Sequence, residues 1–293
     1  MRSCLRVRLH LLLLRVFVGL HIRLRRSRRA AVGLACSVLL LVPAFALAQA
    51  GVYLEALTTS EVQVAVAAGK TTILIPIGGT EQNGPHMVLG KHNVRVRFLA
   101  GRIAARLGNA LVAPVVAYVP EGGIDPPSAH MRFAGTISIP ADVFERELVA
   151  VAQSFAVHGF RDIVFLGDHG GYQKNEAAAA ARFNHAWKHG PARAHALLAY
   201  YRAAAVDFPA ALKARGFHES EIGTHAGLAD TALALAVDPA LVREDVLRAG
   251  HDLDAAHGVH GDPQRATVAL GEIGVDEIVA ASVKAIRQAV ARH

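Results

Sequence analysis

The sequence predicts an α/β protein, a single domain in which helices cover both faces of a mostly parallel sheet. Such a fold is a three-layer α/β/α sandwich. Short, almost wholly apolar runs, typical of strands buried on both faces, alternate with longer segments whose apolar residues recur at helical spacing. The 245 residues after Ala48 also match one large domain, and no linker-like Pro/Ser/Gly tract, charge block or internal repeat divides them.

Each element is predicted from a local pattern, beginning with a capping box. Thr58 and Glu61 form this box, which opens a helix expected to run to about Ala68. Residues 72–77 are apolar almost throughout and end at two glycines, which predicts a buried strand. The elements expected next are a helix over 93–107, a strand over 111–118, a helix over 140–158, a strand over 162–166, a helix over 175–189 and a strand over 194–200. Helices over 204–214, 224–237 and 276–292 complete the chain.

The basic charge of the chain is concentrated in its first 48 residues. The formal net charge is +7, but residues 1–48 hold nine of the 31 basic residues and no acidic one. The remainder has 22 basic residues against 24 acidic ones, a formal charge of −2. The apparent basicity therefore belongs to this segment and not to the domain that follows it.

Residues 1–48 have the pattern of a secretory signal peptide. An Arg-rich stretch through Arg29 is followed by an apolar run that ends in Ala-Leu-Ala, and we expect cleavage after Ala48. The alternative is an uncleaved anchor, because the 19 residues over 30–48 could just span a bilayer. The sequence leaves the translation start and the export route open. We expect an exported, periplasmic protein with residues 1–48 as leader and 49–293 as the functional domain.

Composition and absent motifs exclude several classes of function. Both cysteines, Cys4 and Cys36, lie in the leader, which excludes disulfides, thiolate zinc sites and cysteine nucleophiles in the domain. The sequence contains no G-x-S-x-G, H-E-x-x-H, P-loop or G-x-G-x-x-G motif. The domain has no basic stripe interleaved with aromatic residues, so we expect no nucleic-acid partner. Membrane contact is expected only through an uncleaved leader.

Three polar segments follow predicted strands, where the sites of parallel sheets gather. They are residues 78–93, 121–130 and 167–172. Histidine and carboxylate side chains on separate loops can converge on one Zn²⁺, Mn²⁺ or Fe²⁺ ion. Spacing alone does not establish such a site, because the domain has 14 histidines and most must be solvated or structural.

These segments resemble a known family. Residues 75–86 (Ile-Pro-Ile-Gly-Gly-Thr-Glu-Gln-Asn-Gly-Pro-His) are similar to the signature P-x-G-x-x-E-Q-H-G-P-H of the creatininase (creatinine amidohydrolase) family. Further matches follow in family order at 133–138, 158–160, 167–171, 225–227 and 258–267. The resemblance covers about residues 70–290. It implies an α/β sandwich, a homo-oligomer that is often a hexamer, and metal-dependent hydrolysis of non-peptide C–N bonds, often in cyclic amides.

The resemblance also implies metal ligands. It assigns Glu81, His92 and His169 to one divalent ion, for which we expect zinc, with manganese or iron as alternatives. His92 stands where the family has an aspartate, and histidine is a poor bridge between two ions. The positions that serve a second ion in the family are Asn83 and Gly171, neither of which is a strong ligand. We therefore expect one ion rather than two.

The remaining roles are assigned by the same resemblance. His225 is the expected proton shuttle, and Asp230 is expected to orient it or its neighbours. The alternative for His225 is a structural histidine bonded to backbone at a helix start. Asn83, His130 and Asp168 are expected to line the substrate pocket.

The sequence thus predicts a metal-dependent amidohydrolase that cleaves a small amide, cyclic amides included, through a metal-activated water. Creatinine itself is not expected, because Asn83, His92, Gly171 and Leu228 depart from the family pattern. One alternative is a catalytically lapsed member that binds a small molecule or metal in the periplasm. Another is a mononuclear enzyme with non-hydrolytic chemistry, since two histidines and a carboxylate also suit Fe²⁺.

Overall fold

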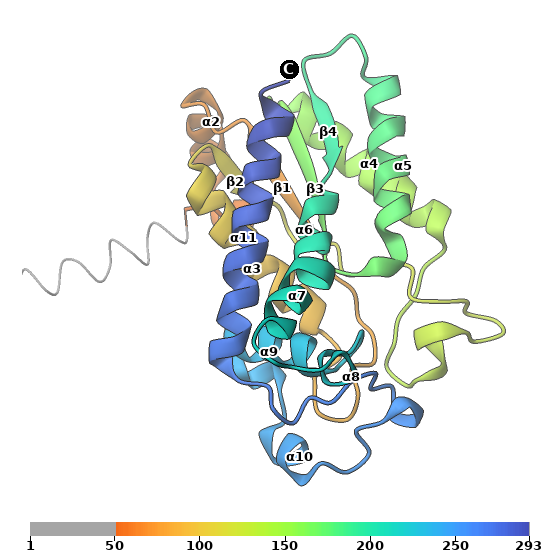
Figure 1. Cartoon of the computed structure of the whole chain (residues 1–293). Coiled ribbons are helices and arrows are strands. Elements are labelled where there is room, and N and C mark those ends of the chain that lie inside the picture. The colour runs from red at the N-terminus through yellow and green to blue at the C-terminus, as the bar shows by residue number, and fades with distance from the viewer. Residues whose placement is uncertain (1–50, 293) are drawn as a thin grey trace, which may run out of the picture. The chain divides into compact units, whose positions relative to one another are not determined.

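The computed structural model describes residues 51–292, and the predicted leader lies outside them. The four strands form one parallel sheet in the order β2-β1-β3-β4 (Figure 1). The strands are β1 (Thr72–Ile77), β2 (Ala110–Val112), β3 (Asp162–Gly167) and β4 (Arg193–Ala196). The predicted α/β fold with a parallel sheet between helices is confirmed.

Alternate side chains of β1 enter two separate cores. Ile73, Ile75 and Ile77 pack on one face of the sheet with residues of α4 (Ala141–Val157) and α5 (Gln173–Ala186). Leu74 packs on the other face, in a core that includes residues of α3 (Lys91–Leu107), α9 (Leu228–Val237) and α11 (Val268–Val290). Because both faces of the strand are covered, it reads in the sequence as a continuous apolar run.

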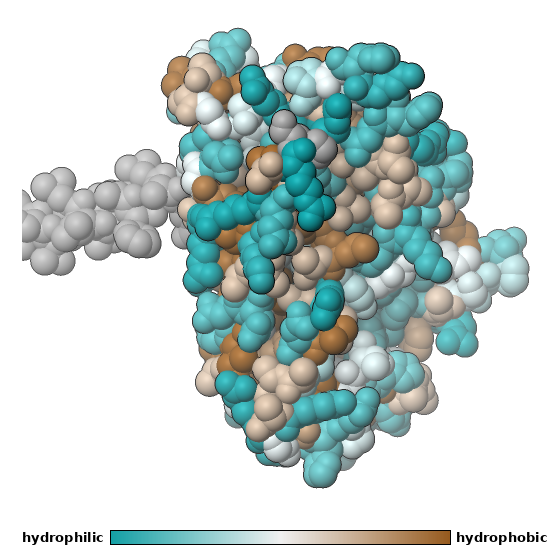
Figure 2. All heavy atoms as spheres, turned by 45° about the horizontal axis from the view of Figure 1, so that its top comes forward, coloured by the Kyte–Doolittle hydropathy of each residue, from teal (hydrophilic) through white to brown (hydrophobic). Residues whose placement is uncertain are grey.

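The remaining helices follow in chain order. They are α2 (Thr59–Ala67), α3 (Lys91–Leu107), α6 (Leu198–Arg202), α7 (Phe208–Lys213), α8 (Glu219–Ile222), α9 (Leu228–Val237), α10 (Glu244–Ala249) and α11 (Val268–Val290). Short 3-10 helices lie at Leu54–Ala56, Ala129–Arg132, Gly170–Tyr172, Pro239–Leu241 and Ala255–His257, and a π-helical turn lies at Ala203–Asp207. None of the described helices is long and apolar enough to cross a bilayer. On the face drawn in Figure 2, hydrophilic and hydrophobic side chains are interspersed.

Two predicted strands are shorter than expected. The strand predicted over 111–118 ends at Val112, because Pro114 has no N–H to donate to the ladder, and the chain meets β1 again only in a bridge between Val116 and Ile77. The strand predicted over 194–200 ends at Ala196, and α6 begins two residues later in a segment rich in helix formers.

Three helices begin elsewhere than predicted. The helix predicted from residue 204 continues the helical stretch that α6 opens at Leu198. The helix predicted from residue 224 begins only at Leu228, because Ala226 has a φ of 54° and the residue before it forms a β-bridge. The last helix begins eight residues earlier than predicted, at Val268, with Thr267 as its N-cap.

Candidate metal centre

Four titratable side chains from three loops converge at the carboxyl ends of the strands. Glu81 follows β1, His169 follows β3, and Glu121 and His130 lie between β2 and α4. One nitrogen or carboxylate oxygen from each of the four lies within 4.8 Å of the others. The three polar segments predicted from the sequence therefore meet at one place.

The buried oxygens of this cluster lack hydrogen bonds. Glu81 Oε2 and both carboxylate oxygens of Glu121 have no hydrogen-bond partner among the described residues. The Nε2 atoms of His130 and His169 lie 3.2 and 3.5 Å from Glu81 Oε2, but neither contact is a hydrogen bond. Buried carboxylate oxygens are costly without a partner. Two carboxylates and two imidazoles form a donor set that suits a divalent cation such as Zn²⁺ or Mn²⁺.

The protonation states of these groups also suit a divalent cation. Burial lowers the pKa of His169 to about 3, and burial also lowers the pKa of His130, so both imidazoles are neutral at pH 7 and able to ligate. Burial and the adjacent charge of Glu81 raise the pKa of Glu121 to about 9. Burial opposes ionisation of Glu81 too, but the contact with His92 and the charge of Lys91 hold its pKa well below the usual range.

His92, in the first turn of α3, lies between two carboxylates. Its Nε2 is 2.7 Å from Glu81 Oε1, and its Nδ1 is 2.6 Å from Asp168 Oδ2. Tyr200 Oη donates to the other oxygen of Asp168 at 2.6 Å. His92 therefore contacts Oε1 of Glu81, whereas His130 and His169 lie near Oε2, and His92 is not one of the four convergent residues.

Two buried cations of α3 complete the network. Lys91 Nζ lies 2.7 Å from Asp230 Oδ2 and 4.0 Å from Glu81 Oε1. Arg95 donates through Nε to Asp168 and through Nη1 to Asp230, each at 2.8 Å. The side chains of Lys91 and Arg95 are only 1% and 4% exposed. Asp230 also accepts a hydrogen bond from the backbone N–H of Ala226, which fixes it at the start of α9.

His225 lies beside the cluster in the extended segment before α9. Its Nδ1 is 3.7 Å from Glu81 Oε1, and burial lowers its pKa to about 4. The amide nitrogen of Gln82 lies 3.0 Å from His225 Nε2 and 3.2 Å from His130 Nδ1. The Gln82 amide oxygen accepts from the N–H of Gly84, so its nitrogen faces the two imidazoles. His225 Nε2 also lies 3.0 Å from the backbone carbonyl oxygen of Gln82, and the tautomer that donates to this oxygen leaves Nδ1 without a proton.

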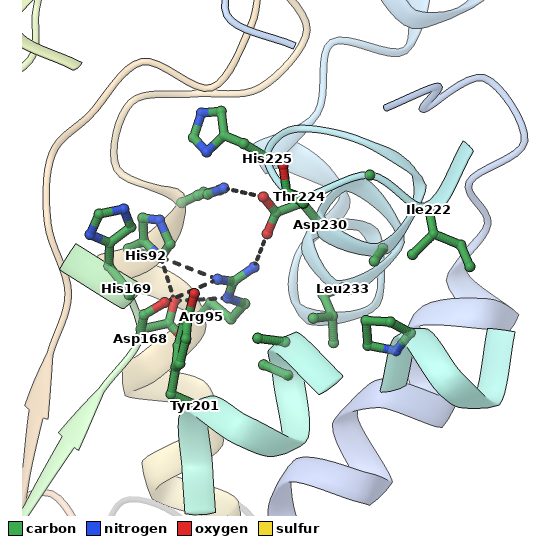
Figure 3. A pocket seen from close by; sticks show the side chains of 17 residues that line it. His92, Arg95, Asp168, His169, Tyr201, Ile222, Thr224, His225, Asp230 and Leu233 are labelled. Atoms are coloured by element: carbon green, nitrogen blue, oxygen red, sulfur yellow. Dashed lines mark hydrogen bonds and ion pairs between the residues drawn. The ribbon is translucent and has the colours of Figure 1, made fainter. Parts of the chain in front are cut away.

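Two cavities adjoin these imidazoles. The first, of about 230 Å³, is bordered by His92, Asp168, His169, His225 and Asp230 among others (Figure 3). The second, of about 510 Å³, is bordered by Glu121, His130 and His169 together with Pro140 and its neighbours. His169 is the one residue that lines both.

The residues that the sequence assigned to the site take different places in the structure. Glu81, His169 and His130 belong to the cluster, and His92, His225 and Asp168 lie against it or border the first cavity. Asp230 holds Lys91 and Arg95 and has no hydrogen bond to His225. Asn83 lines neither cavity, because its amide donates to the carbonyls of Glu81 and Val88.

Sequence reasoning missed Glu121, Lys91, Arg95 and Gln82. Glu121 had a usable signal, because it is a carboxylate just after a β-branched run, as Glu81 is. Gln82 stood inside the recognised motif without a role. Lys91 and Arg95 had no signal, since basic residues on a helix usually lie on its exposed face.

Comparison with known proteins agrees with the fold. A family model described as "Creatininase: Creatinine amidohydrolase" matches residues 55–286. The mycofactocin precursor peptide peptidase of Mycolicibacterium smegmatis is 30% identical over 221 residues, which cover 68% of this chain and 78% of that protein. A solved creatininase described with Mn has a TM-score of 0.67 at 23% identity, covering 81% of this chain and 98% of the other. A creatininase variant of the Zn–Zn type also has a TM-score of 0.67, at 24% identity, covering 81% of this chain and 97% of the other. The chain belongs to the creatininase family of metal-dependent amidohydrolases.

Proposed function

We propose that this protein hydrolyses an amide bond in a small molecule or short peptide, using one divalent ion. Glu81, Glu121, His130 and His169 would hold the ion, and His92 would fix Glu81 from behind. When bound, the ion lowers the pKa of a coordinated water and polarises the amide carbonyl. Zinc is the expected metal, in keeping with the nitrogen and oxygen donors and with the zinc and manganese forms of similar creatininases.

One observation carries this proposal: three buried carboxylate oxygens without hydrogen bonds face two neutral imidazoles. The charge balance supports a single ion. The charged groups in contact with one another at the cluster are four carboxylates and two cations: Glu81, Glu121, Asp168, Asp230, Lys91 and Arg95. With the imidazoles counted as neutral, and Glu121 as ionised when the ion is bound, the sum is −2, which one divalent cation cancels. A second ion would leave an enclosed charge of +2, and unbalanced charge is costly in a low-dielectric site.

His225 is the proposed proton carrier. A pKa of about 4 keeps its imidazole neutral at pH 7, and its Nδ1 faces Glu81 beside the cluster. In that state the ring can take the proton released when the water oxygen bonds to the carbonyl carbon. It then returns this proton to the nitrogen as the C–N bond breaks, so no other reactant is needed. Lys91 and Arg95 hold Asp230 in place beside this step.

The name of the mycobacterial relative favours a wider substrate class than the non-peptide amides predicted from the sequence. A peptide amide and a cyclic amide need the same attack on a carbonyl, so one site can serve either. We also propose that the protein is exported through the leader at residues 1–48 and that it assembles as a homo-oligomer, possible sizes including a hexamer.

The test measures metal content and hydrolysis of blocked dipeptide amides and small cyclic amides. We expect one zinc ion per chain, and a metal affinity more than about 100-fold weaker, with hydrolysis lost, in Glu81→Gln and His169→Ala. Glu277→Gln and His185→Ala change the same residue types at exposed positions and should match the wild type. The proposal would be overturned if Glu81→Gln and His169→Ala kept both their metal and their hydrolytic activity. Metal binding without hydrolysis of any amide would favour the binding-protein alternative.

A further inference from the structure

Three imidazoles line two cavities. We name them the Asp230 cavity, which holds the labelled residues of Figure 3, and the Pro140 cavity. His225 lines the first and His130 lines the second, and these two rings are 4.8 Å apart. His169 lines both cavities. The candidate metal centre therefore opens in two directions.

The walls of the two cavities differ in chemistry. In the Asp230 cavity, Lys91, Thr224 and Asp230 form a polar part, and Ile222 and Leu233 lie apart from it (Figure 3). Away from the cluster, the Pro140 cavity has no charged side chain. Its other lining residues are Pro120, Gly122, Ala129, Ile139, Pro140, Ala141 and Gly171. The second cavity thus offers small apolar side chains and backbone to whatever enters it.

The sizes of the cavities argue against a single small ring as the substrate. At about 510 Å³ the Pro140 cavity falls within the range of roughly 300–1,000 Å³ typical of small-molecule sites, and the Asp230 cavity adds about 230 Å³. A compact cyclic amide bound at the cluster would occupy one cavity and leave the other to water. A substrate extended on both sides of its amide would bury apolar surface in each.

We propose that the substrate is a linear amide extended on both sides of the scissile bond, such as a peptide or a peptide-like N-acyl amine. Its acyl part lies in the Pro140 cavity and its amine part in the Asp230 cavity. This inference rests on the proposed function, since it requires the reacting carbonyl to lie at the cluster.

The orientation of the substrate across the two cavities follows from the position of His225. A group that returns a proton to the leaving nitrogen must come within hydrogen-bond distance of it, about 2.6–3.2 Å. His225 borders only the Asp230 cavity of the two, so the nitrogen must lie on that side. Hydrolysis joins the water oxygen to the carbonyl carbon and leaves the acid in the Pro140 cavity. The protonated amine product leaves through the Asp230 cavity.

Two exposed alanines allow each cavity to be filled separately. Ala141, the first residue of α4, lines only the Pro140 cavity, and Ala205, in the π-helical turn, lines only the Asp230 cavity. Neither belongs to the convergent cluster. Ala141→Trp and Ala205→Trp are therefore a matched pair, each placing the same bulky side chain at one mouth.

The experiment measures the binding of three hydroxamates to the zinc-loaded full chain by calorimetry. Acetohydroxamate carries only the chelating group. N-acetyl-alanyl-alanine hydroxamate extends on the acyl side, and a succinyl hydroxamate coupled to alaninamide extends on the amine side. We expect each extension to tighten binding at least tenfold over acetohydroxamate. Ala141→Trp should abolish only the acyl-side gain, and Ala205→Trp only the amine-side gain.

The other outcomes overturn the inference in different ways. Extended probes that bind no tighter than acetohydroxamate would show that the cavities do not hold substrate. One variant that loses the affinity gains of both extended probes would overturn the assignment of the acyl and amine parts to separate cavities. So would Ala141→Trp removing only the amine-side gain and Ala205→Trp only the acyl-side gain. Acetohydroxamate itself checks that each variant keeps its fold and its zinc. If acetohydroxamate fails to bind the zinc-loaded wild type, the proposed function fails, and this inference fails with it.

Discussion

Arg95 holds the residues behind the metal centre in place. Its guanidinium donates to Asp168 and Asp230, which lie 62 residues apart in the sequence, and its side chain is almost fully buried. Asp168 in turn contacts His92, which contacts Glu81. Removing one partner of a buried ion pair leaves an uncompensated charge, which is far costlier than the pair's net contribution to stability.

Replacing Arg95 should therefore strongly destabilise the protein. We expect Arg95→Met to lower the free energy of unfolding by about 3–5 kcal/mol, because two enclosed carboxylates each lose a cationic partner. Arg146→Met is the control, since Arg146 pairs with Asp142 at the surface, where such a pair contributes at most about 0.5 kcal/mol. Urea denaturation of both variants measures the difference. Equal midpoints would contradict a structural role for the Arg95 pairs.

At this scale, what the sequence can predict depends on the neighbours of each residue. Glu81 and His169 stand just after apolar runs, so strand position alone brings them to the site. Lys91 and Arg95 lie on a helix, where the sequence cannot tell a buried charged face from a solvated one. Their burial depends on Asp230, which lies more than 130 residues away along the chain. The metal-ligand assignments from the resemblance, including His92, stay predictions.

At the scale of elements, the contact between α9 and α11 depends on glycine. A Cβ added at Gly271 would lie 1.9 Å from the carbonyl oxygen of Ala232, and one at Gly274 would lie 2.7 Å from a methyl group of Leu233. The two helices therefore approach as closely as their backbones allow. This packing holds the start of α9, and with it Asp230, against α3.

The Gly271→Ala variant separates packing from helix propensity. Alanine in an exposed helix would stabilise the protein by about 0.5–1 kcal/mol relative to glycine. Here we expect destabilisation by about 1–3 kcal/mol, because backbone must move to admit the methyl group. Thermal unfolding shows whether the variant is more or less stable than the wild type. Glu272→Ala, on the exposed face of the same helix, is the control, and its stability should lie within about 0.5 kcal/mol of the wild type. A stabilised Gly271→Ala would show that the helices separate without cost.

The same glycines explain why the first two turns of α11 were not predicted. Glycine has low helix propensity, so the residues before 276 did not look helical, and tertiary packing overrides that preference. The central strands β1 and β3 were predicted almost to the residue, because burial on both faces gives a continuous apolar run. The end of β2 was missed although Pro114 is a sequence signal for it, whereas the apolar residues that continue past β4 carry no signal for where pairing stops.

The charge of the whole site links metal binding to pH. In the metal-free protein Glu121 has a pKa raised by burial and by Glu81 to about 9, so it is protonated at neutral pH. A carboxyl whose pKa rises on folding stabilises the fold below its unfolded pKa, and this stabilisation is lost as the pH rises towards about 9. His169, with a pKa of about 3, is already neutral in the folded protein above pH 6, so it releases no proton when zinc binds there.

Zinc binding at pH 7 should therefore release one proton, from Glu121. The apparent affinity should rise about tenfold per pH unit between pH 6 and 8.5, because one proton leaves for each ion bound. Calorimetry in buffers of different ionisation enthalpy counts the protons. Glu121→Gln should release none and lose the slope, whereas Glu277→Gln should behave as the wild type. A flat pH profile in the wild type would contradict the protonated state of Glu121.

The contacts of Gln82 affect how the loops around the site can move. Its amide touches His130, His225 and the N–H of Gly84, so three segments far apart in the sequence share one side chain. A bond network of this kind discourages any one loop from opening alone, since each opening breaks contacts held by the others. Entry of substrate and release of product then become a collective fluctuation of the whole rim, slower and rarer than the movement of an untethered loop.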